Sequence, residues 1–123
     1  MKKLFCLLAI AFFVGKATAA PSSPLIGIWL EVGGPGVARI EPCASNRKQL
    51  CAMGLSRRSG AAPIETGIAL SAIQPSGENR WRGAYHDGTR KLPATLRMAN
   101  SNRVEMKVCI LVLCQTATYT RQR

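Results

Sequence analysis

The sequence is poor in the side chains on which most enzyme chemistry depends. Its 123 residues include one histidine, His86, and only six aspartates and glutamates, and no two carboxylates are placed by the sequence for general acid–base work. Ser71 and Ser76 have no identifiable base. The run Gly33–Gly36 contains a proline and no helical pattern follows it, so it is a turn and not a phosphate loop. We therefore expect no enzymatic activity and no cofactor, and we interpret His86 as a surface turn residue.

Long apolar runs are absent beyond the first residues of the chain. Lys2 and Lys3 precede an apolar run over residues 4–14, which small residues follow at 17–19. This order is typical of a secretory signal peptide cleaved after Ala19, and the run is shorter than the roughly 20 residues of a membrane-spanning helix. We predict a signal peptide over residues 1–19, a single domain over residues 20–123, a periplasmic or secreted location and no transmembrane segment.

Zinc-binding cysteine spacing is also absent. Four cysteines follow the predicted cleavage site, Cys43, Cys51, Cys109 and Cys114, and no C-x-x-C pair occurs among them. An even number in a small exported domain indicates disulfides, for which three connectivities are possible. The short spacings favour Cys43–Cys51 and Cys109–Cys114. Zinc is the alternative, but the spacing and the remote position of His86 argue against it, so we expect no metal.

Negative charge is scarce, which leaves a strongly basic chain. After cleavage, 14 basic residues stand against 6 acidic ones, a net charge of +8, and 11 of the 14 are arginines. Export argues against nucleic acid as a partner and favours an anionic lipid, lipopolysaccharide or an acidic polymer. The planar fork of arginine suits phosphate and carboxylate groups. A solvated basic surface without a partner is the alternative.

No segment of the mature chain shows a convincing helical period, and the whole reads as short strands separated by turns. We predict strands over residues 27–32, 37–41, 50–55, 67–73, 103–108 and 115–121, with two more on either side of Asp87–Gly88. A polar loop is expected at 56–66 and a turn at 75–77. Many short strands with one apolar face indicate a closed barrel or a two-sheet sandwich.

The strands around Asp87–Gly88 have a predictable register. A two-residue loop at Asp87–Gly88 would pair His86 with Thr89 and Trp81 with Ala94. Because side chains alternate between faces, one face is then apolar and the other polar. The apolar face carries Trp81, Gly83, Tyr85, Leu92, Ala94, Leu96 and Met98. The polar face carries Arg80, Arg82, Lys91, Pro93, Thr95 and Arg97.

The next strand is placed by two independent requirements. A loop at Asn100–Asn102 puts Met98 opposite Val104, which keeps the apolar residues on one face. The same register puts Arg97 opposite Glu105, a cross-strand ion pair that contributes roughly 0.2–1 kcal/mol. Pro93 would lie between two partners without an N–H to donate, so we expect a bulge there.

Several of these segments together resemble a family of small exported bacterial proteins, domain of unknown function 2147. The resemblance is carried by Gly27-Ile28-Trp29, Ile40 with Cys43, Leu50-Cys51, Trp81-Arg82-Gly83-Ala84-Tyr85, Gly88, and Cys109 to Arg121. It implies a small antiparallel up-and-down β-barrel of about eight strands, similar to lipocalins and related calycins. In such barrels an arginine, here Arg121, packs over a first-strand tryptophan, here Trp29, with a cation–π contribution of about 0.5–2 kcal/mol. The family carries no established activity, so the resemblance implies a fold and no chemistry.

Two functions from different classes follow, because an eight-stranded barrel holds either side chains or one small ligand. The first is a non-enzymatic binding protein for a small apolar or amphipathic ligand, held in the barrel or at its mouth by Trp81, Tyr85, Met98 and Met106. The second is an interaction protein with a filled barrel, whose outer face binds an anionic envelope component or a protein through Arg80, Arg82 and Lys91. A third, an inhibitor of a secreted enzyme acting through the loop Ala44–Gln49, ranks below both.

Overall fold

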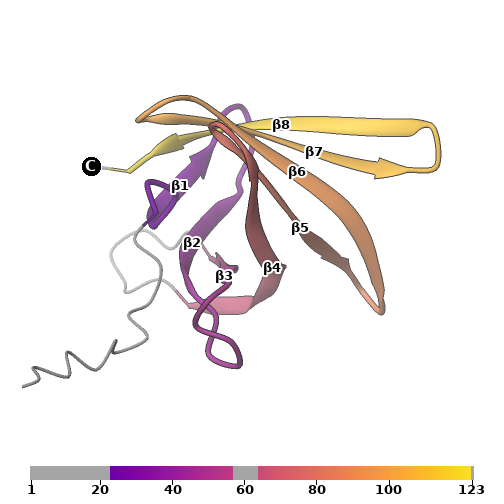
Figure 1. The fold of residues 1–123 in the computed structure, drawn as a ribbon, viewed down its shortest axis with the longest axis horizontal. Helices are drawn as coiled ribbons and strands as arrows, with labels where there is room; N and C mark the ends of the chain where they lie inside the picture. The colour runs from indigo at the N-terminus through magenta and orange to yellow at the C-terminus, as the bar shows by residue number, and fades with distance from the viewer. Residues whose placement is uncertain (1–22, 57–63, 123) are drawn as a thin grey trace, which may run out of the picture.

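The described residues form eight consecutive β-strands and no helix. A computed structural model describes residues 23–56 and 64–122, so the predicted signal peptide lies outside the described residues, as does most of the predicted loop at 56–66. The strands are β1 (Gly27–Glu31), β2 (Val37–Pro42), β3 (Leu50–Leu55), β4 (Glu65–Gly77), β5 (Arg80–Asp87), β6 (Arg90–Asn100), β7 (Arg103–Ile110) and β8 (Leu113–Arg121). Each strand pairs antiparallel with the next, and β8 pairs with β1, which closes the barrel (Figure 1). The predicted all-β up-and-down barrel is confirmed. In these two ranges no helix has the length and hydropathy to cross a membrane.

The two ends of the barrel differ. Successive strands run in opposite directions, so the turns alternate between the ends. One end, which we term the closed end, is filled by buried side chains, namely Leu25, Leu50, Ile73, Trp81 and Met98. The other end, which we term the mouth, carries the turns after β1, β5 and β7.

Trp29 and Arg121 meet beside the closed end, as predicted. Trp29 is 2% exposed, and its Nε1 donates a hydrogen bond to the Leu25 carbonyl at 2.8 Å. The guanidinium carbon of Arg121 lies 4.4 Å from the centroid of the Trp29 ring. Gly27 has a φ of +146°, and a Cβ there would lie 2.6 Å from Nη1 of Arg121. Position 27 therefore needs glycine both for its backbone and for the approach of the arginine.

Both predicted disulfides are present. Cys43, which directly follows β2, is bonded to Cys51 in β3. Cys109 of β7 is bonded to Cys114 of β8, its direct cross-strand partner. Each bond therefore joins two strands that are neighbours in the chain.

The predicted pairing of β6 with β7 is also confirmed. Met98 lies opposite Val104 and Arg97 opposite Glu105. The Arg97 Nη2 to Glu105 Oε2 distance is 2.7 Å. The predicted loop Asn100–Asn102 is one residue shorter, because β6 extends to its first position.

The turn between β5 and β6 lies one residue later than predicted. Asp87 pairs with Arg90, so Gly88 and Thr89 form the loop. Gly88 has a φ of +59° at the first loop position, where a type II′ turn places glycine. An ion pair between Asp87 and Arg90 at 2.6 Å adds to this register.

The predicted pairing of Trp81 with Ala94 is consequently wrong, and Trp81 lies opposite Leu96. The partner shifts by two residues, so every side chain keeps its predicted face. On the inward face the buried residues are Trp81, Ala94, Leu96 and Met98. On the outward face the exposed residues are Arg80, Arg82, Lys91, Pro93, Thr95 and Arg97.

Pro93 ends a ladder and does not form the predicted bulge. Pro93 pairs with Ala84 of β5. On its other side the β6–β7 ladder ends at the pair Ala94–Val108, so Pro93 has no partner in β7. Proline has no N–H to donate to a second neighbour. The bulge prediction is wrong because β6 leaves β7 at this point instead of distorting to stay beside it.

The predicted turn at residues 75–77 is likewise wrong. β4 runs on to Gly77, and the turn that follows contains Asn79 with a φ of +56°. Pro75 lies in β4 opposite β5, beyond Ile73, where the β3–β4 ladder has ended. Its missing N–H therefore interrupts no ladder on the β3 side.

Candidate functional site at the barrel mouth

Two long hairpins, β5–β6 and β7–β8, extend past the other strands and diverge at the mouth (Figure 1). The end of the β6–β7 ladder at Ala94–Val108 allows this divergence. The diverging strands leave a groove of about 590 Å³, which we term the mouth groove. It is lined by Glu31, Tyr85, Asp87, Leu92, Met106, Val108, Ile110, Leu113, Gln115, Thr116, Ala117 and Tyr119. Its volume lies within the 300–1,000 Å³ typical of small-molecule sites.

Tyr85, Met106 and Tyr119 form the floor of the mouth groove. The same three residues line a second cavity beneath it, which measures only about 60 Å³. That volume is several times below the range of small-molecule sites, because core side chains such as Trp29 and Leu96 fill the barrel. A ligand would therefore occupy the groove above the floor and not the interior.

Glu31 contributes a carboxylate to one wall of the mouth groove. Its carboxylate accepts a hydrogen bond from the amide of Gly36 at 3.0 Å. Burial of the Tyr119 phenol raises its pKa, and the negative charge of Glu31 raises it further. Tyr119 therefore stays a neutral hydroxyl, and the groove combines aliphatic and polar side chains with a carboxylate acceptor.

The structure brings two of the four predicted ligand residues to this site. Tyr85 and Met106 lie in the floor. Trp81 and Met98 lie instead in the core at the closed end, and neither lines the mouth groove. The strand pattern correctly placed all four on an inner face but carried no information on how far each lies from the mouth.

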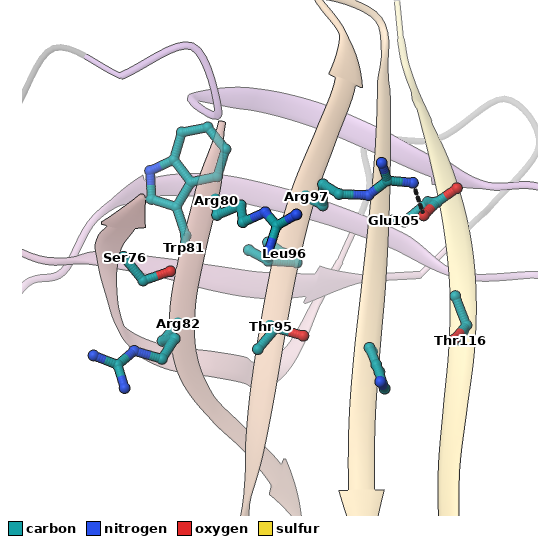
Figure 2. Close-up of a pocket in the computed structure, with 10 residues that line it drawn as sticks. Ser76, Arg80, Trp81, Arg82, Thr95, Leu96, Arg97, Glu105 and Thr116 are labelled. Carbon is teal, nitrogen blue, oxygen red and sulfur yellow. Dashed lines mark hydrogen bonds and ion pairs between the residues drawn. The ribbon is translucent and has the colours of Figure 1, made fainter. Parts of the chain in front are cut away.

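A second hollow lies on the outer face of β5 to β8 (Figure 2). It has a volume of about 620 Å³ and contains four cations, Arg80, Arg82, Arg97 and Lys107, which we term the basic groove. Strand register explains why these cations cluster. Arg80 of β5 lies opposite Arg97 of β6. Thr95 of β6 lies between Arg82 of β5 and Lys107 of β7.

One of the four cations of the basic groove is neutralised. Arg97 pairs with Glu105 (Figure 2), and the hydrogen bond from Arg97 lowers the pKa of the Glu105 carboxyl. Within residues 23–56 and 64–122, no carboxylate pairs with Arg80, Arg82 or Lys107. Lys91, predicted to belong to this surface, is exposed but lies opposite His86, outside the groove.

Ser71 and His86 form a contact that the sequence did not reveal. The Oγ of Ser71 lies 2.7 Å from Nε2 of His86, so Ser71 does have a neighbouring base. His86 lies within β5 and is half-buried, which corrects its interpretation as a turn residue. Neither residue lines the mouth groove or the basic groove, and the nearby carboxylate of Asp87 is paired with Arg90. Only the register of β4 against β5, which the sequence did not give, would have predicted the contact.

Arginines neutralise most of the carboxylates. Arg39 donates hydrogen bonds to both Glu65 and Glu41, and these bonds, the one to Glu65 most of all, raise the pKa of its guanidinium. Asp87 and Glu105 are also paired with arginines. In the described part of the chain no three potential ligands among His, Cys, Asp and Glu gather into a metal site.

Comparison with known proteins gives no identity. No family model matches the chain, and neither a curated protein nor a solved structure matches it. The resemblance to domain of unknown function 2147 therefore stays a prediction.

Proposed function

We propose that this protein is an exported, non-enzymatic binding protein that holds a small apolar or amphipathic ligand in the mouth groove. The observation that carries the proposal is an open groove of about 590 Å³ above a barrel interior with only about 60 Å³ of free space. The two disulfides fit an oxidising compartment such as the periplasm or the extracellular space.

The lining favours a ligand with an apolar body and a polar end. Leu92, Met106 and Val108 offer aliphatic surface, and the aromatic floor adds rigid contact area. Glu31 would accept a hydrogen bond from the polar end, and Tyr119 would remain a neutral hydroxyl. A molecule buried there would gain mainly from removal of apolar surface from water.

Titration with the neutral apolar fluorophore N-phenyl-1-naphthylamine tests this site. Wild-type protein should enhance its fluorescence saturably, and Leu92→Gln with Met106→Gln should weaken binding about tenfold or more, since two apolar contacts become polar. The matched control is Arg82→Gln with Lys107→Gln, which changes the outer face and should bind the probe like wild type. Equal binding by the groove variant, or no binding by wild type, would overturn the proposal.

Native mass spectrometry of protein purified from its own exported fraction would then identify the natural ligand. A mass increment lost in the Leu92→Gln, Met106→Gln variant is the expected result. Its absence from wild type, together with the absence of probe binding, would contradict a ligand at the mouth.

The basic groove favours a second candidate function, the binding of an anionic polymer. Arg80, Arg82 and Lys107 have no ion-pair partner among the described residues and share one hollow. The triple change of these residues to Gln should lower the salt concentration that elutes the protein from immobilised heparin. The control is Arg47→Gln, Lys48→Gln, Lys91→Gln, which removes the same charge from exposed positions outside the basic groove. If both triple variants elute at the same salt, net charge alone explains the binding and the groove has no specific role.

A further inference from the structure

The turn between β7 and β8 is an exposed apolar tip. It consists of Ile110–Leu113, which we term the apolar tip, and its four side chains are 44%, 95%, 92% and 76% exposed in chain order. Two-residue hairpin loops are normally built from Gly, Asn or Asp. Burial in the barrel does not explain these side chains, because Leu111 and Val112 are almost entirely in solvent.

Backbone conformation shows that folding does not require leucine at this position. Leu111 has a φ of +55°, whereas the corresponding position of the β5–β6 turn is Gly88 with a φ of +59°. A bulky residue in the left-handed region is strained, and glycine or asparagine would relieve the strain. The leucine therefore opposes local stability, which is the behaviour of a side chain present for contact with something outside the fold.

Exposed apolar side chains gather at the same end of the molecule. Of the eight large exposed hydrophobics among the described residues, only Ile26 belongs to the closed end. Six of the other seven lie in or beside the turns at the mouth, namely Val32, Ile64 and the four residues of the apolar tip, and the seventh, Ile68, is the fourth residue of β4 counted from that end. The mouth is therefore the apolar end of a basic protein.

The apolar tip is also rigid and projecting. Cys109 and Cys114, bonded to each other, close the hairpin directly behind the tip. The β7–β8 hairpin reaches well beyond the β1–β3 side of the barrel (Figure 1). A rigid loop gives up little conformational freedom on binding.

We propose that the apolar tip inserts into the interface of an anionic lipid bilayer and anchors the protein with its mouth toward the membrane. Lys107 lies three residues behind Ile110, about 10 Å along the strand. When Ile110 reaches the acyl boundary, the Lys107 backbone therefore lies just outside the headgroup region, which occupies about 5–7 Å per leaflet, and the long flexible side chain of Lys107 extends its ammonium group back to the phosphates. Anchoring by apolar insertion with cations behind it is the arrangement of interfacial membrane proteins.

The net charge of the chain favours a lipid bilayer over a second copy of the chain as the partner of the apolar tip. The chain carries a net charge of +11, or +8 after the predicted cleavage, so two copies would repel one another when their tips meet. A membrane surface containing phosphatidylglycerol offers both acyl chains for the apolar tip and phosphates for Lys107 and its neighbours. The proposal does not depend on a ligand in the mouth groove.

Tryptophan fluorescence tests insertion directly. Val112→Trp should shift to shorter wavelength on addition of vesicles of phosphatidylglycerol and phosphatidylcholine in equal parts, and brominated lipid should quench it. Ser101→Trp, in the β6–β7 turn at the closed end, is the matched control and should show neither effect. The native Trp29 and Trp81 are buried and contribute a constant background.

Co-sedimentation with the same vesicles tests the energetics. Leu111→Asn with Val112→Ser keeps the charge, should melt at the same or a higher temperature, and should bind about tenfold more weakly or worse. Wild-type binding should fall with salt and be weaker to phosphatidylcholine alone. Unquenched Val112→Trp, or equal sedimentation of wild type and tip variant, would overturn the proposal. So would a lipid-independent dimer of wild type that the tip variant abolishes while neither protein sediments with vesicles.

Discussion

At the residue scale, Arg121 joins three segments at the closed end through one side chain. Its guanidinium stacks on Trp29 and donates hydrogen bonds to the carbonyls of Ser101, Ile26 and Pro24. The planar fork of arginine makes this possible, because it presents several donors in fixed directions while its face contacts an aromatic ring. The turn after β6, the lead-in to β1 and the end of β8 are thereby tied together.

Removal of the Trp29 side chain should therefore be severe. Trp29→Ala is expected to lower the free energy of unfolding by about 3–5 kcal/mol, since a large buried aromatic leaves a cavity and Arg121 loses its stacking partner. Urea denaturation followed by circular dichroism measures the change. Val32→Ala, at an exposed position, should change stability little. A loss below about 1 kcal/mol for Trp29→Ala would contradict its role in the core.

Tyr119 gives the protein a specific sensitivity to alkali. Burial and the charge of Glu31 raise the pKa of its phenol in the folded state, above the value of about 10 expected in the unfolded chain. The folded state therefore retains the proton more strongly, so this stabilisation is complete below about pH 10 and is lost as pH rises through the folded pKa. Unfolding free energies of wild type and Tyr119→Phe, measured from neutral to alkaline pH, should diverge above about pH 10. Parallel curves would show that Tyr119 titrates normally.

At the element scale, the β5–β6 and β7–β8 hairpins build similar turns from different residues. Each has a two-residue loop with a positive φ at its first position, Gly88 in one and Leu111 in the other. Glycine adopts this conformation without strain, whereas leucine does not. The β7–β8 hairpin has a disulfide behind its loop, and the β5–β6 hairpin has an ion pair between Asp87 and Arg90.

The Cys109–Cys114 disulfide should stabilise the β7–β8 hairpin locally. Cys109→Ser with Cys114→Ser is expected to cost about 2 kcal/mol, because the closed loop is short. The barrel should remain folded while amide exchange accelerates in residues 108–116. The matched control, Cys43→Ser with Cys51→Ser, should cost a similar amount and leave exchange in that hairpin unchanged. Equal exchange in both variants would mean that the disulfide does not hold the apolar tip.

At the scale of the whole molecule, closure at one end and divergence at the other come from the same sheet. The closed end gathers large side chains from β3 to β6 beneath the lead-in to β1. The mouth opens because β6 and β7 separate after Ala94–Val108. Polar and apolar surfaces are consequently segregated, with the basic groove on the outer face of β5 to β8 and exposed hydrophobics at the mouth.

Processing of the whole chain provides a test of export. Cleavage after Ala19 would remove Cys6 and leave four cysteines, all of them in the two disulfides. Intact mass spectrometry of the exported protein should therefore find a chain that begins at Ala20 and takes up no thiol reagent under denaturing, non-reducing conditions. An uptake of reagent, or a chain that retains residues 1–19, would contradict this prediction.

The sequence by itself determined the features that depend on near neighbours. Strict alternation of apolar and polar residues fixed which face of β5, β6 and β7 is buried, because a slip of one residue would bury arginines. Charge pairing of Arg97 with Glu105 set the β6–β7 register, and short spacing set both disulfides. Turn position was less well determined, since Asp87–Gly88 and Gly88–Thr89 satisfy the same alternation and only backbone conformation at Gly88 distinguishes them.

Only the tertiary structure decided the features that depend on distant strands. Pro93 excludes a second hydrogen-bonded neighbour, but whether the sheet bulges or parts there depends on where the β6–β7 ladder ends. The floor residue Tyr119 and the wall residue Glu31 lie at opposite ends of the chain and meet because β8 pairs with β1. Tyr85 lies at the mouth and Trp81 at the closed end. The height of a residue along the barrel axis is set by the stagger of the strands on closure and not by alternation along a strand.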